Sequence, residues 1–152
     1  MDLQRFLDGQ SPVMGTVMAE LAAGAKRSHW IWFVFPQLAA LGRSGTAKFY
    51  GIADLDEARA YLAHPVLGAR LKTCTRAMLA HRNRSAHAIL GSPDDLKFRS
   101  CMTLFALAAP EDPLFREALA VFHRGEADPL TLQVCGVTGL DDRADPSSSG
   151  AA

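Results

Sequence analysis

Residues 26–37 carry a high density of side chains that could bind a ligand. Two tryptophans, two phenylalanines, a histidine and two cations fall within these twelve residues. Aromatic rings beside cations can hold flat or anionic molecules by stacking, cation–π contact and charge-assisted hydrogen bonds. We therefore expect Trp30 or Trp32 to stack on a ring and Lys26 to bind an anionic group. Gln37 is a further candidate contact to the ligand.

His29, from the same segment, is the candidate for proton transfer, because an imidazole titrates near neutral pH. The alternative interpretation of this segment is an ordinary piece of the core. In that case the rings fill space, His29 satisfies a backbone group and the cations are solvated. The residue types alone leave both interpretations open.

A second dense segment spans residues 92–105. Two acidic residues in its first helical turn suit the helix dipole, and Asp95 is a second candidate for proton transfer. Lys97 and Ser100 follow at helical spacing, share one face, and are candidate ligand contacts. The alternative is that this face is simply the solvent side of a helix. We predict that the two segments meet in one polar-lined pocket, with His29 and Lys97 within about 10 Å of each other.

Several kinds of site are not indicated by the sequence. The five histidines form no HxH or HExxH pattern, and the three cysteines form no CxxC pair. We therefore expect no metal site. The sequence also contains no phosphate-binding glycine motif, so we expect no cofactor. The odd number and wide spacing of the cysteines fit reduced thiols.

The bulk properties narrow the partners and the location. The chain has 152 residues and a formal net charge of zero, so we expect no nucleic-acid partner. No apolar run approaches the roughly 20 residues that span a bilayer. The N-terminus lacks the pattern of a secretory signal, and a cytoplasmic location is expected by default. The sequence leaves open whether the chain has a protein partner.

The elements that must position these residues are predicted to be helices. Helix starts are indicated by Ser or Asp directly before proline, by His64-Pro65 and by a capping box at Asp54. The Ser-Pro and Asp-Pro pairs begin at residues 11, 92, 112 and 128. Apolar stripes at helical spacing follow these starts. We expect an all-α, or nearly all-α, compact bundle of about six to eight helices, with one domain over residues 1–138. The polar residues 139–152 are expected to form a disordered tail.

The run from residue 30 to residue 35 is ambiguous, because β-branched and aromatic residues suit both a buried strand and a buried helix. No other segment offers a clear strand partner. A buried helix is therefore favoured, and a strand remains the alternative.

The chain resembles the bacterial family DUF1810, which is grouped with a mycobacterial helical protein. The resemblance lies in the blocks 26–37, 41–44, 57–68 and 95–105. It implies a compact helical fold and no established reaction. Similar proteins usually carry a serine where this chain has Cys101, which argues against a thiol nucleophile.

A shorter likeness, to the NADAR family of helical proteins, involves positions 57, 61, 64–65, 68 and 97–98. That family is linked to ADP-ribose and riboside chemistry, so the likeness favours a nucleotide-like ligand. The expected function is therefore binding or hydrolysis of a nucleotide- or ADP-ribose-like small molecule. The alternative is a noncatalytic protein-interaction module that uses the aromatic segment 29–37.

Overall fold

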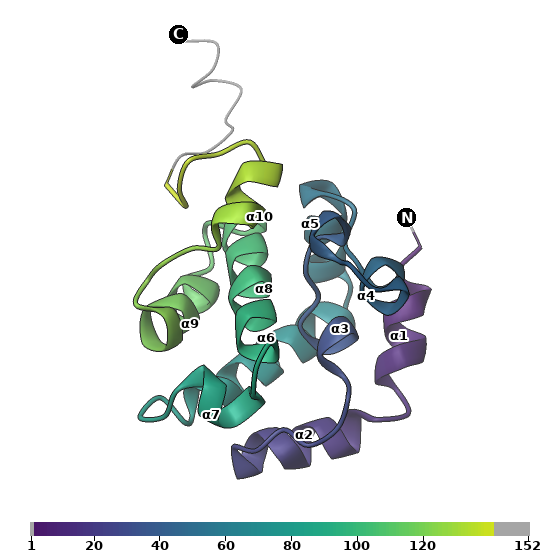
Figure 1. Ribbon diagram of the computed structural model, residues 1–152. Coiled ribbons are helices and arrows are strands. Elements are labelled where there is room, and N and C mark those ends of the chain that lie inside the picture. The colour runs from purple at the N-terminus through teal and green to yellow at the C-terminus, as the bar shows by residue number, and fades with distance from the viewer. Residues whose placement is uncertain (1, 142–152) are drawn as a thin grey trace, which may run out of the picture.

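The computed structural model describes residues 2–141, and this part of the chain is all-α, as predicted (Figure 1). In chain order the helices are α1 (Gln4–Gln10), α2 (Met14–Ala23), α3 (Ile31–Val34), the 3-10 helix η1 (Ala39–Leu41), α4 (Gly45–Phe49), α5 (Leu55–Ala63), α6 (Leu67–Leu79), α7 (Ala86–Leu90), α8 (Asp94–Ala108), α9 (Leu114–His123) and α10 (Pro129–Val134).

The described residues form ten α-helices, more than the six to eight expected. Three of them, α3, α4 and α7, have only four or five residues. Helices this short show too little periodicity to be recognised from their apolar pattern. Two of the three, α4 and α7, are capped by serine hydroxyls that accept hydrogen bonds from the backbone.

Helix α8 is the centre of the molecule (Figure 1). It packs against α9 on one side and α5 on the other, with α7 and α10 near its two ends. Phe98 and Phe105 on α8 are fully buried. Phe105 lies 5.5 Å from the ring of Tyr61 on α5 and 5.8 Å from Phe115 on α9. The core therefore joins helices from all along the chain.

The ambiguous aromatic run is helical, as favoured. Residues 31–34 form α3, and Phe35 ends this helix. Only an isolated bridge between Leu38 and Ile52 has β geometry in the part of the chain that the structure describes. The run lies in the core, with Trp30 and Phe35 each 1% exposed.

Several predicted helix starts are confirmed. Asp54 accepts a hydrogen bond from the backbone of Glu57, and Asp128 accepts one from the backbone of Thr131. Asp112 also accepts from the backbone at the start of α9. Each carboxylate satisfies an amide that has no partner within its helix.

The start predicted at Ser11 is wrong, whereas at Ser92-Pro93 a helix begins as predicted but without the expected cap. The chain is already helical in α1 before Ser11, and α2 begins only at Met14. Pro93 stands directly before α8, and no side chain within residues 2–141 caps this helix. Ser92 is therefore not a cap, and the loss of about 1 kcal/mol that a cap would imply for Ser92→Ala is not expected.

No described helix is both long and apolar enough to cross a membrane. Most of the predicted tail, from residue 142 onward, lies outside the described residues. The last described residue, Asp141, pairs with Arg116 at 2.8 Å.

Candidate functional site

The two segments singled out in the sequence meet at the start of α8. The Nζ atom of Lys26 lies 2.7 Å from a carboxylate oxygen of Asp94. Lys97, one turn further along α8, places its Nζ atom 5.3 Å from the ring centroid of Trp32. One ion pair and one cation–π contact therefore join the segments.

Lys26 is not placed to bind a ligand. Its side chain is only 6% exposed, and its ammonium group is held by Asp94 and by the backbone oxygen of Ser28, at 2.6 Å. A buried ammonium needs such partners, because leaving water costs free energy that only ion pairing and hydrogen bonds recover. The expectation that Lys26 binds an anionic ligand is therefore corrected: its charge is used inside the fold.

Trp30 is also a core residue, which corrects its expected role in stacking. It is 1% exposed, and its indole N–H donates to Glu20 at 2.9 Å. Burial opposes the ionisation of Glu20, but hydrogen bonds from Ser28, from Trp30 and from two backbone amides outweigh this and lower its pKa to about 2. Glu20 therefore fixes the aromatic segment to α2. Trp32, in contrast, is partly exposed.

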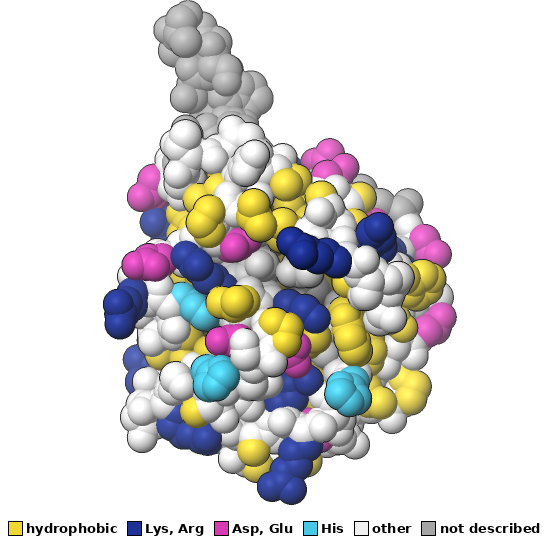
Figure 2. Space-filling model, in the orientation of Figure 1, with side chains coloured by type: hydrophobic (Ala, Val, Ile, Leu, Met, Phe, Trp, Pro, Cys, Tyr) yellow, Lys and Arg dark blue, Asp and Glu magenta, His cyan; other side chains and the backbone are white. Residues whose placement is uncertain are grey.

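A cavity of about 620 Å³ lies between α8, α10 and the loop 42–44 that links η1 to α4. We call it the main cavity. Figure 2 shows apolar side chains beside lysine or arginine side chains on the face that carries α10. The lining residues are Gln37, Leu41, Gly42, Arg43, Ser44, Ala47, Pro93, Leu96, Lys97, Arg99, Ser100, Asp128 and Leu130. Three sequence candidates, Gln37, Lys97 and Ser100, are among them.

Positive charge predominates in this lining. Arg43, Lys97 and Arg99 face one carboxylate, Asp128, among the described residues that line the main cavity. Arg99 is partly committed, since its guanidinium donates to the backbone oxygens of residues 126 and 127. Arg43 is exposed and makes no hydrogen bond or ion pair within the described part of the chain. Arg43 is therefore the cation most available to a ligand.

The other polar groups of the lining are mostly occupied. Ser44 caps α4, and Ser100 donates to the backbone oxygen of Leu96. Asp128 accepts hydrogen bonds from both the backbone and the hydroxyl of Thr131. Gln37 makes no side-chain hydrogen bond within the described chain and so keeps its amide for a ligand. Among the described lining residues, the cavity offers cations and an amide, and its carboxylate and serine hydroxyls are already hydrogen-bonded.

The two candidate catalytic residues do not line the main cavity. His29 is exposed and is absent from the lining. Asp95 is turned toward α7 and α9: one oxygen lies 3.8 Å from His87, and the other is buried without a hydrogen-bond partner. Burial and the nearby Arg99 lower the pKa of His123, while Asp95 opposes this shift. Neither candidate for proton transfer is therefore placed to act in the main cavity.

The positions of the shorter likeness have structural roles. Glu57 pairs with Arg5 at 2.9 Å. The buried hydroxyl of Tyr61 accepts a hydrogen bond from Gln10, and burial raises its pKa. Of these positions, only Lys97 lines the main cavity. The positions that carry the shorter likeness therefore do not identify the residues of the main cavity.

Sequence reasoning missed Arg43, Arg99, Leu96 and Leu130 as candidates. The block 41–44, which carries part of the family resemblance, contained the signal for Arg43. Leu130 gave no such signal, because an apolar residue on a short helix looks like core until the fold leaves it 58% exposed. No group of three or more His, Cys, Asp or Glu residues within residues 2–141 could hold a metal ion.

Comparison with known proteins agrees with this fold. The model of the family DUF1810, a protein of unknown function, matches residues 1–135. The chain is similar to the crystal structure of the conserved hypothetical protein Rv1873 from Mycobacterium tuberculosis, with a TM-score of 0.87 and 49% sequence identity over 90% of this chain and 98% of that one. No curated protein matches the chain. A family match over nearly all the described residues, together with this identity, shows that the protein belongs to the DUF1810 family.

Proposed function

We propose that this protein binds an anionic, ring-bearing small molecule of the nucleotide class in the main cavity. The observation that carries the proposal is Arg43, a lining cation that is unpaired among the described residues. Lys97 and Arg99 also line the cavity, and each has a carboxylate nearby, Asp94 at 4.0 Å and Glu126 at 3.8 Å. A guanidinium without a protein partner is a ready donor to phosphate, which it can bind through two parallel hydrogen bonds.

The apolar walls suit a flat ring. Leu41, Leu96 and Leu130 line the cavity, and Leu96 and Leu130 are 54% and 58% exposed. Exposed leucines around a concave site are covered when a ligand binds, and this burial favours binding. A cavity of 620 Å³ falls within the range of roughly 300 to 1,000 Å³ that small-molecule sites occupy. A cation beside apolar walls suits a ligand in which a phosphate is joined to a nucleobase better than it suits a small inorganic ion.

The proposal is binding without hydrolysis. A hydrolytic site needs a positioned acid or base within hydrogen-bond reach of the bond that breaks. Among the described residues of the lining, the one carboxylate, Asp128, already caps α10. His29 and Asp95 lie outside this lining. These positions support a binding role.

The alternative, a protein-interaction module built on segment 29–37, has no observation in its favour. Most of its rings are buried, including Trp30, Phe33 and Phe35. A docking patch needs contiguous exposed apolar surface, and here that surface surrounds the main cavity instead.

The proposal is tested by ligand-induced stabilisation followed by calorimetry, with AMP, ADP and ADP-ribose as probes. A probe at about 100 times its Kd stabilises the native state by roughly 2.7 kcal/mol. For a domain of this size, that raises the melting temperature by about 5 to 10 °C. Arg43→Gln should weaken binding about tenfold or more, because a hydrogen bond to a charged group is worth roughly 1.5 to 3 kcal/mol.

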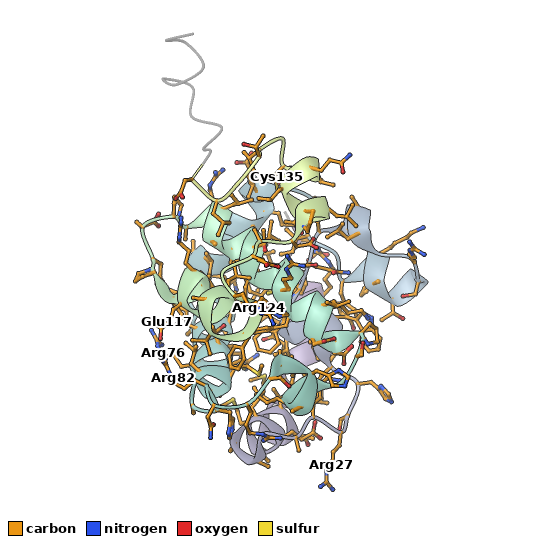
Figure 3. The ribbon with its side chains drawn as sticks, turned by 60° about the vertical axis from the view of Figure 1, so that its left-hand side comes forward. Arg27, Arg76, Arg82, Glu117, Arg124 and Cys135 are labelled. Carbon is orange, nitrogen blue, oxygen red and sulfur yellow. The ribbon has the colours of Figure 1, made fainter. Side chains whose placement is uncertain are left out.

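The matched control is Arg27→Gln. Arg27 is also exposed, and its side chain extends away from the body of the protein (Figure 3). This variant should bind the probes like the unmodified chain. The proposal is wrong if no probe shifts the melting temperature at millimolar concentration, or if the two variants lose affinity equally.

A further inference from the structure

The main cavity continues into a second cavity along α10, and from this we infer that the ligand is bipartite. In this arrangement an anionic linker lies at Arg43, one ring-bearing end occupies the main cavity, and a second end lies against the last turn of α10. The inference rests on the proposed function, because it names the class of molecule that the same site binds. It predicts two nucleoside-like ends joined by a phosphate or pyrophosphate bridge.

The second cavity has a volume of about 440 Å³. It shares Leu41, Gly42, Arg43 and Leu130 with the main cavity. The two spaces are therefore adjacent, and Arg43 and Leu130 stand at their junction. A ligand confined to the main cavity would leave the second space and its apolar walls in water.

The residues that line the second cavity but not the main cavity are suited to a ring and not to a charge. They are Ala40, Gln133 and Val134. Val134 is 50% exposed, and so offers apolar surface that a ligand can cover. Gln133 is exposed and makes no side-chain hydrogen bond within the described chain, so its amide can donate to and accept from a polar ring edge.

The position of the charge determines where the linker lies. Arg43 is the one charged residue among the described residues that line the second cavity, and it also lines the main cavity. Lys97 lies only on the main-cavity side. A phosphate bridge at the junction would contact Arg43 directly, with the nucleoside ends on either side. A guanidinium suits this place because its donors form a planar fork that can bind oxygens of a diphosphate.

The two cavities follow one another along α10. Its six residues extend roughly 9 Å at 1.5 Å per residue, and the two cavities lie along it from Asp128 to Val134.

Calorimetry with ADP and diadenosine diphosphate tests the inference. In both probes an adenosine is joined to a pyrophosphate. Diadenosine diphosphate carries a second adenosine at the other end of the pyrophosphate, and ADP does not. Charge favours ADP, so tighter binding of the dinucleotide must come from its second end. We expect the dinucleotide to bind about tenfold tighter than ADP, as burial of a second ring in an apolar site implies. If it binds no tighter than ADP, the inference is overturned while the proposed function stands.

The variant Val134→Trp fills the second cavity, and it should reduce dinucleotide affinity to the level of ADP while changing ADP affinity less than about twofold. Val66→Trp is the matched control, because Val66 is 39% exposed and lines neither cavity. It should leave both affinities unchanged. An equal loss for both probes in Val134→Trp would contradict the two-cavity arrangement. If neither probe binds the unmodified chain, the proposed function itself fails.

Discussion

Lys26 and Asp94 form an ion pair whose members differ in exposure. The side chain of Lys26 is 6% exposed and that of Asp94 is 17% exposed. Asp94 has a second cation nearby, since Lys97 lies 4.0 Å from its other oxygen. Lys26 has no other carboxylate within ion-pair distance among the described residues. Loss of Asp94 therefore leaves Lys26 without an ion-pair partner in the described chain, whereas loss of Lys26 leaves Asp94 with Lys97.

Removing the carboxylate should cost more stability than removing the ammonium. Asp94→Ala should lower the free energy of unfolding by about 3 kcal/mol, because it leaves a buried ammonium uncompensated. Lys26→Met should cost only about 1 kcal/mol, since Asp94 is more exposed and retains Lys97. Urea denaturation of both variants measures the difference.

Arg59→Ala is the control for this comparison. Arg59 and Asp56 form an exposed pair, with side chains 53% and 78% exposed. Its loss should change stability by less than about 1 kcal/mol. Equal costs for Asp94→Ala and Lys26→Met would show that the ion pair is not asymmetric.

At the scale of elements, Glu20 joins α2 to the segment before α3. Its carboxylate accepts hydrogen bonds from the backbone of Arg27, from the backbone and side chain of Ser28, and from the indole of Trp30. Without this carboxylate, the backbone amides at residues 27 and 28 would lose their protein acceptor. The aromatic segment is thus held in the core by an acidic residue from another helix.

This contact should depend on pH in a defined direction. The pKa of Glu20 falls from its ordinary value of 4.5 to about 2 in the fold. A lowered folded-state pKa stabilises the protein above the unfolded-state value and stops doing so as the pH falls through the folded-state value. The stabilisation from Glu20 should therefore be complete above about pH 5 and disappear between roughly pH 4.5 and pH 2.

The difference in unfolding free energy between the unmodified chain and Glu20→Gln measures this effect. Other carboxylates titrate in both proteins and cancel in the difference. At pH 7 the unmodified chain should be more stable, and the gap should narrow as the pH approaches 2. Glu111→Gln, at an exposed position, is the control. A gap that stays constant from pH 7 to pH 2.5 would mean that the charge of Glu20 is not what stabilises the contact.

At the scale of the whole molecule, aromatic contacts centred on α8 connect both halves of the chain. Phe98 packs edge-on against Phe35 at 4.9 Å, and Phe105 contacts Tyr61 and Phe115. A core shared in this way favours one cooperative unfolding transition. The single-domain prediction can therefore be tested in solution.

Unfolding followed by far-ultraviolet circular dichroism and by tryptophan fluorescence should give coincident transitions. The first method reports all the helices, whereas the second reports the environment of Trp30 and Trp32. Phe105→Ala should shift both transitions together and cost about 3 to 5 kcal/mol, as expected for truncating a buried ring. Phe105→Leu is the milder variant if the alanine variant fails to fold. Two separate transitions would contradict the single domain.

The sequence by itself determined the helical class and several helix boundaries. Asp54 and Asp128 could be identified as caps because a cap depends on a few neighbouring backbone amides. The helical nature of residues 31–34 was also favoured correctly. The prediction that Ser92 caps α8 was wrong, because a serine before proline permits a cap without requiring one. Helix α8 begins without a side-chain cap among the described residues. Local chemistry therefore predicted elements well where the deciding contact is itself local.

The site depended on the tertiary structure. Lys26 and Trp30 have side-chain types suited to ligand binding, yet packing against Asp94 and Glu20 uses both inside the fold. The main cavity forms where the segments 41–44, 96–100 and 128–130 converge. Nothing in the spacing of such distant residues requires them to meet. Their convergence depends on how α8, α10 and the loop after η1 pack, and that packing also leaves Arg43 unpaired within the described chain and Leu130 exposed.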